Sequence, residues 1–270
     1  MLYQTFSELR SIFHLPSSPA PAPSPPQAIG LATAPVLLCI DLEAYELDQS
    51  QITEIGLSTL DTRDILGLSP GTSPAAWLAH MRTTHILIAE HRHLVNGRYV
   101  AGCPDKFLHG TSQAMSLAEA QRLVVAAFKA PGVLRSTREP EERDILLVGH
   151  GVRDDVRYLS SIGISDIPSR VIDTQRLCSS KRRPVGLAKL LDALQMEYSW
   201  LHNAGNDAAF TLEALLRLVW LYGFDEVALR GVMDRLGAPM PPGPKARKNE
   251  AANAAAAAAA TAAQTHVDGA

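Results

Sequence analysis

Between residues 36 and 222, short apolar segments of strand length alternate with longer amphipathic ones. By this pattern we expect strands at 36–42, 52–60, 84–89, 145–149 and 170–173, and helices at 116–130, 153–162, 186–194 and 206–222. The first of these helices opens with a Ser-Leu-Ala-Glu capping box. Strands that alternate with helices in this order predict an α/β sheet with helices on both faces.

Proline-rich sequence marks both ends of this region. PSSPAPAPSPPQ, which starts at Pro16, predicts an extended linker, and an alanine-rich stretch follows a second proline cluster that starts at Pro239. We therefore expect an N-terminal segment and linker at 1–35, one folded domain at 36–237 and a disordered tail at 238–270. Apolar residues recur at near-helical spacing in 1–14. This segment either docks on the domain or binds a protein partner, and the sequence leaves both open.

Composition narrows the class of protein. With 46% hydrophobic and 20% charged residues, the chain suits a globular protein with a sizeable core. Its three cysteines show no CxxC spacing, and no apolar run approaches the roughly 20 residues that span a bilayer. The N-terminus lacks a signal pattern, so we expect an intracellular protein, cytoplasmic or nuclear, without membrane association. The net charge of −3 means that any nucleic-acid binding must use a local basic patch and bound metal.

Two acids lie at the end of the first expected strand. Asp41 and Glu43 are two positions apart, so their side chains project from the same face. Two carboxylates held together in this way repel each other unless a cation lies between them, and hard oxygen ligands suit Mg²⁺ or Mn²⁺. For an isolated Asp-x-Glu pair, a strand that runs out into a solvated turn is the simpler explanation.

Further acids follow the strand at 145–149. In VGHGVRDDVRYL, Asp154 and Asp155 fall in the first turn of the next helix, where the helix dipole favours carboxylates. They point about 100° apart, so at most one of them faces the strand ends. A purely structural acid at the helix start is the alternative for either one.

The last cluster lies in LHNAGNDAAF. His202 stands in a loop of small residues, and Asp207 opens a long apolar helix. Such a loop can place an imidazole over a metal site while the carboxylate stays anchored. A solvated loop histidine is the alternative.

Together these clusters resemble the three motifs of the DEDDh 3′–5′ exonucleases: Asp41-x-Glu43, Asp155 in a GHxxxxD setting, and His202-x-x-x-x-Asp207. The resemblance covers about residues 36–222 and implies a ribonuclease H-like mixed β-sheet flanked by α-helices. The stretches 96–110, 171–177 and 202–211 further resemble a fungal Gfd-type branch associated with RNA metabolism and mRNA export. Asp154 departs from the common family pattern, which has Asn before the ligand.

The resemblance implies hydrolysis of single-stranded RNA or DNA from the 3′ end with two Mg²⁺ or Mn²⁺ ions, about 3.5–4 Å apart in such sites. Asp41, Glu43, Asp155 and Asp207 would hold the ions, with Asp41 bridging them. His202 would be the general base, since an imidazole accepts a proton close to neutral pH. Two other functions stay open: a hydrolase of short oligonucleotides and a non-catalytic adaptor in RNA metabolism.

Other residues are weaker candidates. A zinc site could be assembled from His91, His93, Cys103 and His109, but their spacing matches no familiar pattern, so we interpret them as unrelated residues. Asp173 is expected to organise the turn after its strand. Possible phosphate contacts are Arg153, Arg157 and the run Lys181-Arg182-Arg183.

Overall fold

The computed structural model describes residues 1–15, 34–68, 71–134, 141–180 and 183–241. Most of the expected linker, most of the expected tail, and Lys181 and Arg182 lie outside these ranges. Within the described residues, no helix combines the length and the apolar character that crossing a membrane requires.

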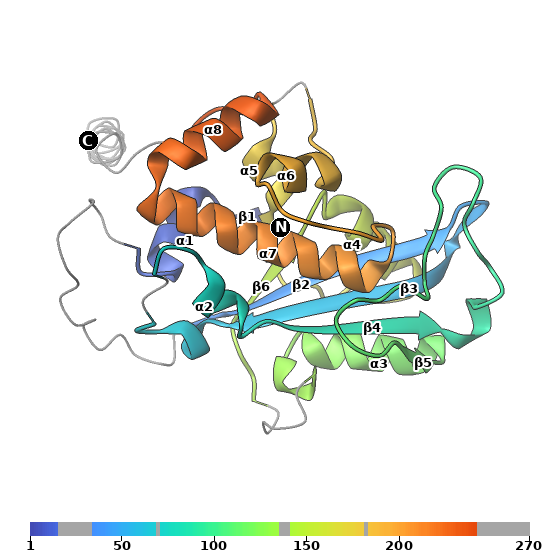
Figure 1. Ribbon diagram of the computed structural model, residues 1–270. Coiled ribbons are helices and arrows are strands. Elements are labelled where there is room, and N and C mark those ends of the chain that lie inside the picture. Colours follow the sequence, from blue (N-terminus) through green and yellow to red (C-terminus); the bar gives the residue numbers. More distant parts are fainter. Residues whose placement is uncertain (16–33, 69–70, 135–140, 181–182, 242–270) are drawn as a thin grey trace, which may run out of the picture.

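The centre of the fold is a seven-stranded mixed sheet with the strand order β1-β7-β6-β2-β3-β4-β5 (Figure 1). Its strands are β1 (Leu2–Tyr3), β2 (Val36–Tyr45), β3 (Asp48–Asp61), β4 (Arg82–Ile88), β5 (Gln113–Met115), β6 (Ile145–Gly149) and β7 (Arg170–Asp173). Strand β3 runs antiparallel to both of its neighbours, β2 and β4, and the remaining pairs are parallel. The expected mixed sheet is therefore confirmed.

Strands β2 and β3 form a long hairpin that extends beyond the predicted strands. The apolar pattern stops near Leu42, whereas β2 continues to Tyr45 and β3 already begins at Asp48. Most of the added residues are polar, and pairing with the other strand of the hairpin keeps them extended. In this register Asp41 lies opposite Gly56 and Glu43 lies opposite Glu54.

Helices cover both faces of the sheet, as expected. The helices are α1 (Phe6–Ile12), α2 (Ala75–Leu78), α3 (Leu117–Ala127), α4 (Arg153–Ser161), α5 (Thr174–Cys178), α6 (Leu187–Ala193), α7 (Ala204–Phe224) and α8 (Glu226–Leu236). Short 3-10 turns lie at Thr62–Ile65, Ala89–His91 and Pro131–Leu134. The predicted capping box of α3 is confirmed, since the backbone N–H of Ser116 donates to Glu119 at 2.9 Å and the backbone N–H of Glu119 donates to the Ser116 hydroxyl at 3.3 Å.

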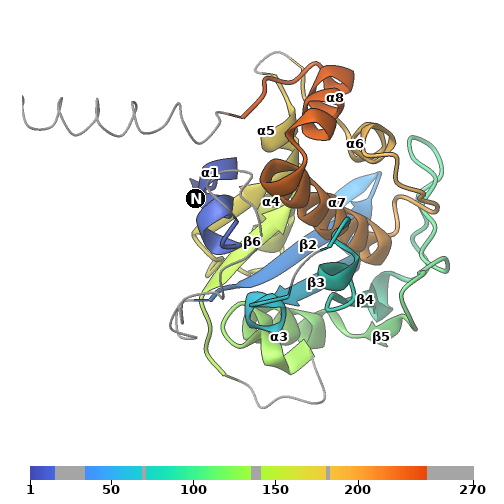
Figure 2. The same ribbon diagram turned by 60° about the vertical axis from the view of Figure 1, so that its left-hand side comes forward.

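Alternate residues of β2 enter two hydrophobic cores. Leu38 and Ile40 pack with α3 and α4, whereas Leu37 and Cys39 pack with α7 and the helices around it. Figure 2 shows α3 below the sheet and α7 above it. Asp41 and Glu43 continue the Leu37–Cys39 series, so strand alternation directs both acids toward α7.

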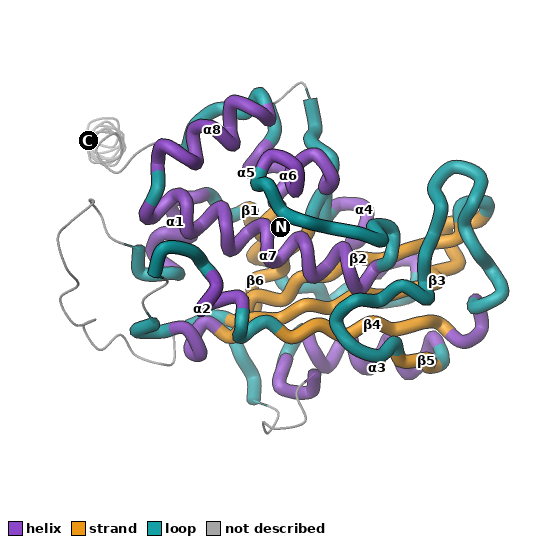
Figure 3. The backbone as a smooth tube through the Cα atoms, viewed as in Figure 1, coloured by secondary structure: helices purple, strands orange, loops and turns teal. Residues whose placement is uncertain are grey.

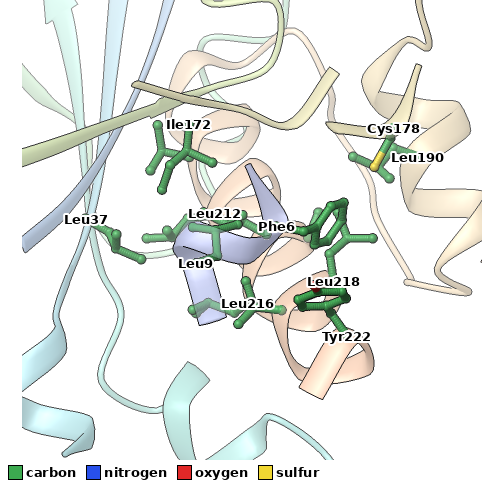
Figure 4. Packing of buried hydrophobic residues seen from close by; sticks show 14 of the residues in the cluster. Phe6, Leu9, Leu37, Ile172, Cys178, Leu190, Leu212, Leu216, Leu218 and Tyr222 are labelled. Atoms are coloured by element: carbon green, nitrogen blue, oxygen red, sulfur yellow. The ribbon is translucent and has the colours of Figure 1, made fainter. Parts of the chain in front are cut away.

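The N-terminal segment packs against the domain. Strand β1 pairs with β7 at the edge of the sheet, and α1 buries Phe6 and Leu9 in the core on the α7 side (Figure 4). The Phe6 and Tyr222 rings lie 5.2 Å apart between centroids, and the Arg10 guanidinium lies 4.8 Å from the Tyr222 ring centre. Of the two alternatives for this segment, docking on the domain is the arrangement observed.

A long loop, residues 92–112, connects the turn after β4 to β5. Figure 3 shows it rising beyond the ends of β2 and β3 and returning beneath the start of α7. The Glu46 carboxylate accepts hydrogen bonds from the backbone N–H groups of Gly97, Arg98 and Tyr99 at 2.8–3.1 Å. The loop is thus fastened to the β2–β3 turn although it has no helix or strand of its own.

Candidate active site

The start of α7 lies against the backbone of β3. A Cβ atom added at Gly56 would lie 1.8 Å from the Ala204 carbonyl oxygen, and one added at Gly205 would lie 2.7 Å from the His85 side chain. Only glycine leaves room for this approach. Because Gly56 lies opposite Asp41 in the sheet, the close packing brings the first turn of α7 over the two acids of β2.

Hydrogen bonds fix the loop that carries His202. The Asn203 side chain caps α7 by accepting from the backbone N–H of Asn206 at 3.1 Å. The backbone N–H of His202, a residue with a φ of 65°, donates to Asp207 Oδ2 at 3.0 Å. The His202 Nδ1 atom lies 3.8 Å from Glu43 Oε1. One ligand atom each from Glu43, His202 and Asp207 lies within 4.8 Å of the others, so the first and third sequence clusters meet.

Asp155 approaches the same strand end from α4. Its carboxylate accepts a hydrogen bond from the backbone N–H of Leu42 at 3.0 Å, and the residue is 7% exposed. Asp154 points outward and forms a surface ion pair with Arg157 at 3.3 Å. The two adjacent acids therefore have different environments, and Asp155 is the one that lies beside the acids of β2.

Burial raises the pKa of each of the four acids, and the charges of the other acids add to this rise for Asp41 and Glu43. Burial and the charges of Asp207 and Asp155 raise the pKa of Asp41 well above its usual range. Burial and the Glu54 charge raise the pKa of Glu43 to about 8. Burial is also the main cause that raises the pKa values of Asp155 and Asp207 to about 7 each. The metal-free site is thus a set of carboxyl groups that resist simultaneous ionisation.

Partial burial lowers the pKa of His202 below its usual value. The neutral imidazole is therefore the dominant form at neutral pH, and a neutral ring nitrogen can accept a proton.

A fifth acid, Glu54, belongs to this region and was not predicted. It is 3% exposed, accepts from His85 Nε2 at 2.8 Å and accepts from the backbone N–H of Ala204 at 3.3 Å. His85 Nδ1 continues the chain to the Ser112 hydroxyl at 2.9 Å. These buried hydrogen bonds connect β3 and β4 to the start of α7, directly after the loop that carries His202. A charged residue inside the apolar ITEIGLSTL strand is the one sequence signal that pointed to it.

The donor set fits a hard divalent cation. Asp207 Oδ1 is buried without a hydrogen-bond partner among the described residues, and a cation would satisfy it. Cys39 is fully buried nearby, and burial together with the charge of Asp41 raises the pKa of its thiol well above the usual range. The thiol therefore stays protonated, and the donors left are carboxylate oxygens and one imidazole. Oxygen donors of this kind favour Mg²⁺ or Mn²⁺ over soft metals.

A cleft of about 450 Å³ opens from this site. Glu43, Glu54 and His202 line one part of it, and residues from the 92–112 loop, among them Asn96, Asp105 and Phe107, line the rest. Its volume falls in the range of small-molecule binding sites.

The weaker candidates have structural roles or remain apart. His91 Nδ1 lies 2.5 Å from the Ile52 carbonyl oxygen, and the Cys103 thiol lies 3.2 Å from that of Leu201. Within the described ranges, the group of potential metal ligands consists of Glu43, His202 and Asp207 and includes neither His91 nor Cys103. Asp173 caps α5 and also accepts from the backbone N–H of Gly151, so it organises two turns.

A family model described as DNA polymerase III subunit epsilon-like, C-terminal domain, of the DEDDh type, matches residues 36–218. The chain belongs to this DEDDh family. The ribonuclease H-like architecture expected for such a protein agrees with the mixed sheet and its flanking helices.

Relatives of this DEDDh chain come from two yeasts. It is 34% identical over 190 residues to an uncharacterized nucleolar protein of Schizosaccharomyces pombe, a match that covers 66% of each chain. It is 27% identical over 205 residues to the Good for full DBP5 activity protein 2 of Saccharomyces cerevisiae, covering 67% of this chain and 35% of that protein. The DEDDh chain thus spans less than two thirds of either relative's length. The expected resemblance to the Gfd-type branch is confirmed.

Among solved structures, the exonuclease module of Saccharomyces cerevisiae Pan2 in complex with AAGGA RNA is similar, with a TM-score of 0.44 and 16% identity. That alignment covers 75% of the DEDDh chain and 32% of the other. An Escherichia coli ExoI–ssDNA complex is similar with a TM-score of 0.38 and 12% identity, covering 73% and 42% of the two chains.

Proposed function

We propose that this protein is a metal-dependent 3′–5′ exonuclease that hydrolyses the phosphodiester bonds of single-stranded RNA or DNA. The observation that carries the proposal is the convergence of four acids and one histidine from three separate sequence clusters on one strand end. Membership of the DEDDh family supports it. All five residues of the family pattern are present, whereas a protein that had lost catalysis would be free to lose them.

The proposed roles follow from the geometry. Asp41, Glu43, Asp155 and Asp207 would hold two Mg²⁺ or Mn²⁺ ions. The unpartnered Oδ1 atom of Asp207 and the mutual repulsion of the acids both favour cation binding. When bound, such ions lower the pKa of water and offset the charge that develops on phosphate oxygens.

His202 is the proposed general base. It is half-exposed at the cleft, its backbone is anchored on Asp207, and its ring lies beside Glu43. Because its pKa lies below the usual histidine value, the ring is free to accept a proton from water at neutral pH.

The test is incubation with RNA and DNA oligonucleotides labelled at the 5′ or the 3′ end, with Mg²⁺, Mn²⁺ or EDTA. We expect a ladder of 5′-labelled products that shorten from the 3′ end, and release of the labelled mononucleotide from 3′-labelled substrate. EDTA and the Asp41→Asn variant should both abolish the products. Cleavage confined to dinucleotides would favour the short-oligonucleotide hydrolase, and no cleavage with either metal would favour the adaptor.

Residues 36–237 form the proposed exonuclease domain, against which residues 1–15 pack. We further propose that the protein acts inside the cell, in the nucleus or the cytoplasm. The nucleolar description of the Schizosaccharomyces pombe relative supports this proposal. Fluorescence microscopy of the tagged full chain tests it, and a secreted or membrane-bound signal would contradict it.

A further inference from the structure

Large hydrophobic side chains are exposed near the cleft. Among the described residues, those on the β2–β3 turn, the 92–112 loop and the loop before α7 are Leu47, Val95, Tyr99, Val100, Leu108 and Trp200. Tyr99 is 70% exposed and Trp200 is 50% exposed. Exposed apolar residues that gather in one region, in contrast to scattered ones, mark a binding surface.

The backbone beneath these side chains is fixed by hydrogen bonds. The Asn206 side chain on α7 accepts from the backbone N–H of Leu108 at 2.9 Å and donates to the Lys106 carbonyl at 2.9 Å and the Trp200 carbonyl at 3.1 Å. Asn203 donates to the Cys103 carbonyl at 3.1 Å. The two loops are therefore joined to each other and to the first turn of α7. A ligand bound there would find a surface that is already ordered.

The Tyr99 and Trp200 rings each have a cation next to them. The Lys106 ammonium lies 5.6 Å from the centre of the Trp200 ring, and the Arg98 guanidinium lies 5.4 Å from the centre of the Tyr99 ring. Trp200 has a φ of 57°, a conformation that costs free energy in a residue other than glycine. The protein thus holds a half-exposed indole in an unfavourable backbone conformation, which packing in the core does not explain.

One of these pairs, Lys106–Trp200, lies next to the candidate active site. Trp200 is two residues from His202, which lines the cleft. Lys106 lies between Asp105 and Phe107, and both of these line the same cleft. The Lys106–Trp200 pair therefore adjoins the wall of the cleft. It lies where the 92–112 loop meets the loop before α7.

We propose that Arg98, Tyr99, Lys106 and Trp200, here called the aromatic rim, bind unpaired nucleotides of a single strand by stacking bases on the two rings. The proposal rests on the proposed function of the adjacent site. Aromatic rings stack on any base, and adjacent cations contact phosphates, so this combination suits single strands of varied sequence. It also reconciles the net charge of −3 with a nucleic-acid substrate, since stacking does not require an excess of positive charge.

A shallow salt dependence follows from this arrangement. The rim supplies two cations, and two phosphate contacts on a single strand give a slope of about −1.4 for log affinity against log salt concentration. A surface that bound through many lysines and arginines would give a much steeper slope. Duplexes should bind more weakly, because their bases are already stacked on each other.

The experiment measures binding separately from cleavage. The full chain carrying Asp41→Asn is titrated in Mg²⁺ against fluorescently labelled 12-nucleotide RNA and DNA strands and the matching duplexes. Adding Trp200→Ala should weaken single-strand binding by about 5- to 150-fold, the range for loss of one stacked base. Trp200→Phe should retain most of the affinity, because it keeps an aromatic face.

Phe224→Ala is the matched control. Phe224 is 44% exposed at the opposite end of α7, so its loss should leave oligonucleotide binding unchanged. Thermal unfolding of each variant identifies any that fail to fold.

Unchanged binding by a folded Trp200→Ala variant would overturn the proposal, as would equal affinity for duplexes. The surface would then be assigned to a protein partner. Binding that depends on Trp200 in a protein without nuclease activity would refute the proposed function and leave the aromatic rim standing. Cleavage without any effect of the Trp200 substitution on binding would refute the aromatic rim and leave the proposed function standing.

Discussion

Asp207→Asn should stabilise the metal-free protein at pH 8 and abolish its stabilisation by divalent cations. Asp207 is 7% exposed, and its Oδ1 atom has no hydrogen-bond partner among the described residues. In the variant, the amide oxygen can keep the hydrogen bond from the backbone N–H of His202, and the amide nitrogen can donate toward the remaining acids. The substitution therefore removes a repulsive negative charge, and it replaces the unpartnered Oδ1 atom with a group that can form a hydrogen bond.

The magnitude follows from the pKa of Asp207. Its rise from 3.8 to about 7, caused chiefly by burial, corresponds to about 4 kcal/mol in the free energy of unfolding. A carboxyl group with a raised pKa contributes stability that is complete below about pH 4 and is lost as the pH rises through 7. Because the neighbouring acids titrate together, we expect removal of one charge to recover roughly half, about 2 kcal/mol. In a protein of this size that is about 4–8 °C in melting temperature.

The assay is thermal unfolding from pH 4.5 to 8 in EDTA, repeated with millimolar Mg²⁺ or Mn²⁺. In EDTA the curves for wild type and Asp207→Asn should converge toward pH 4 and separate toward pH 8, with the variant more stable. Cations should raise the melting temperature of wild type, as ligand linkage requires, and leave that of the variant nearly unchanged.

Asp154→Asn is the control. Asp154 is exposed and forms a surface ion pair with Arg157, so its loss should change the free energy of unfolding by less than about 1 kcal/mol. A variant Asp207→Asn that is less stable than wild type in EDTA at pH 8 would refute the repulsion argument. A full cation response in that variant would mean that the ion binds without Asp207.

Three further predictions concern neighbouring residues. His202→Ala should reduce turnover by roughly 10²–10⁴-fold while keeping the cation-induced rise in melting temperature, and loss of that rise would make the imidazole a metal ligand. Gly56→Ala should lower the free energy of unfolding by about 3 kcal/mol in urea titrations, since its Cβ would collide with the Ala204 carbonyl; an unchanged midpoint would contradict this packing. Glu54→Gln, which keeps an acceptor for His85, should lower the pKa of Glu43 in NMR titrations in EDTA, because the Glu54 charge helps to raise it; an unchanged Glu43 pKa would contradict this cause.

The mixed sheet could be predicted, and the acids could be proposed as site residues, because both depend on local signals. Apolar runs such as 145–149 have the length of a strand, and strand alternation already puts Asp41 and Glu43 on one face. The choice of Asp155 over Asp154 depended on helix geometry and on the family pattern. The structure places Asp155 beside Leu42 and leaves Asp154 exposed.

Other features depend on contacts between distant residues and had a weak local signal or none. Strand β1 has two residues, too few for any periodic pattern. Glu54 could have faced solvent in an isolated strand, and its burial depends on contacts with His85 of β4 and Ala204 of α7. The 92–112 loop is held by Glu46 and Asn206, which lie far from it in sequence, so its shape could not be inferred from its own residues.

The N-terminal segment packs on the domain. The part of the chain that packs together is therefore longer than the part that the family model matches. The family match begins at residue 36 and ends at 218, yet α1 buries Phe6 and Leu9 against α7, and α8 buries Leu229 and Met233. A chain trimmed to the matched region would uncover this apolar surface and leave β7 as an unpaired edge. We therefore expect trimmed versions to aggregate, and expression of the protein should keep residues 1–15 and α8.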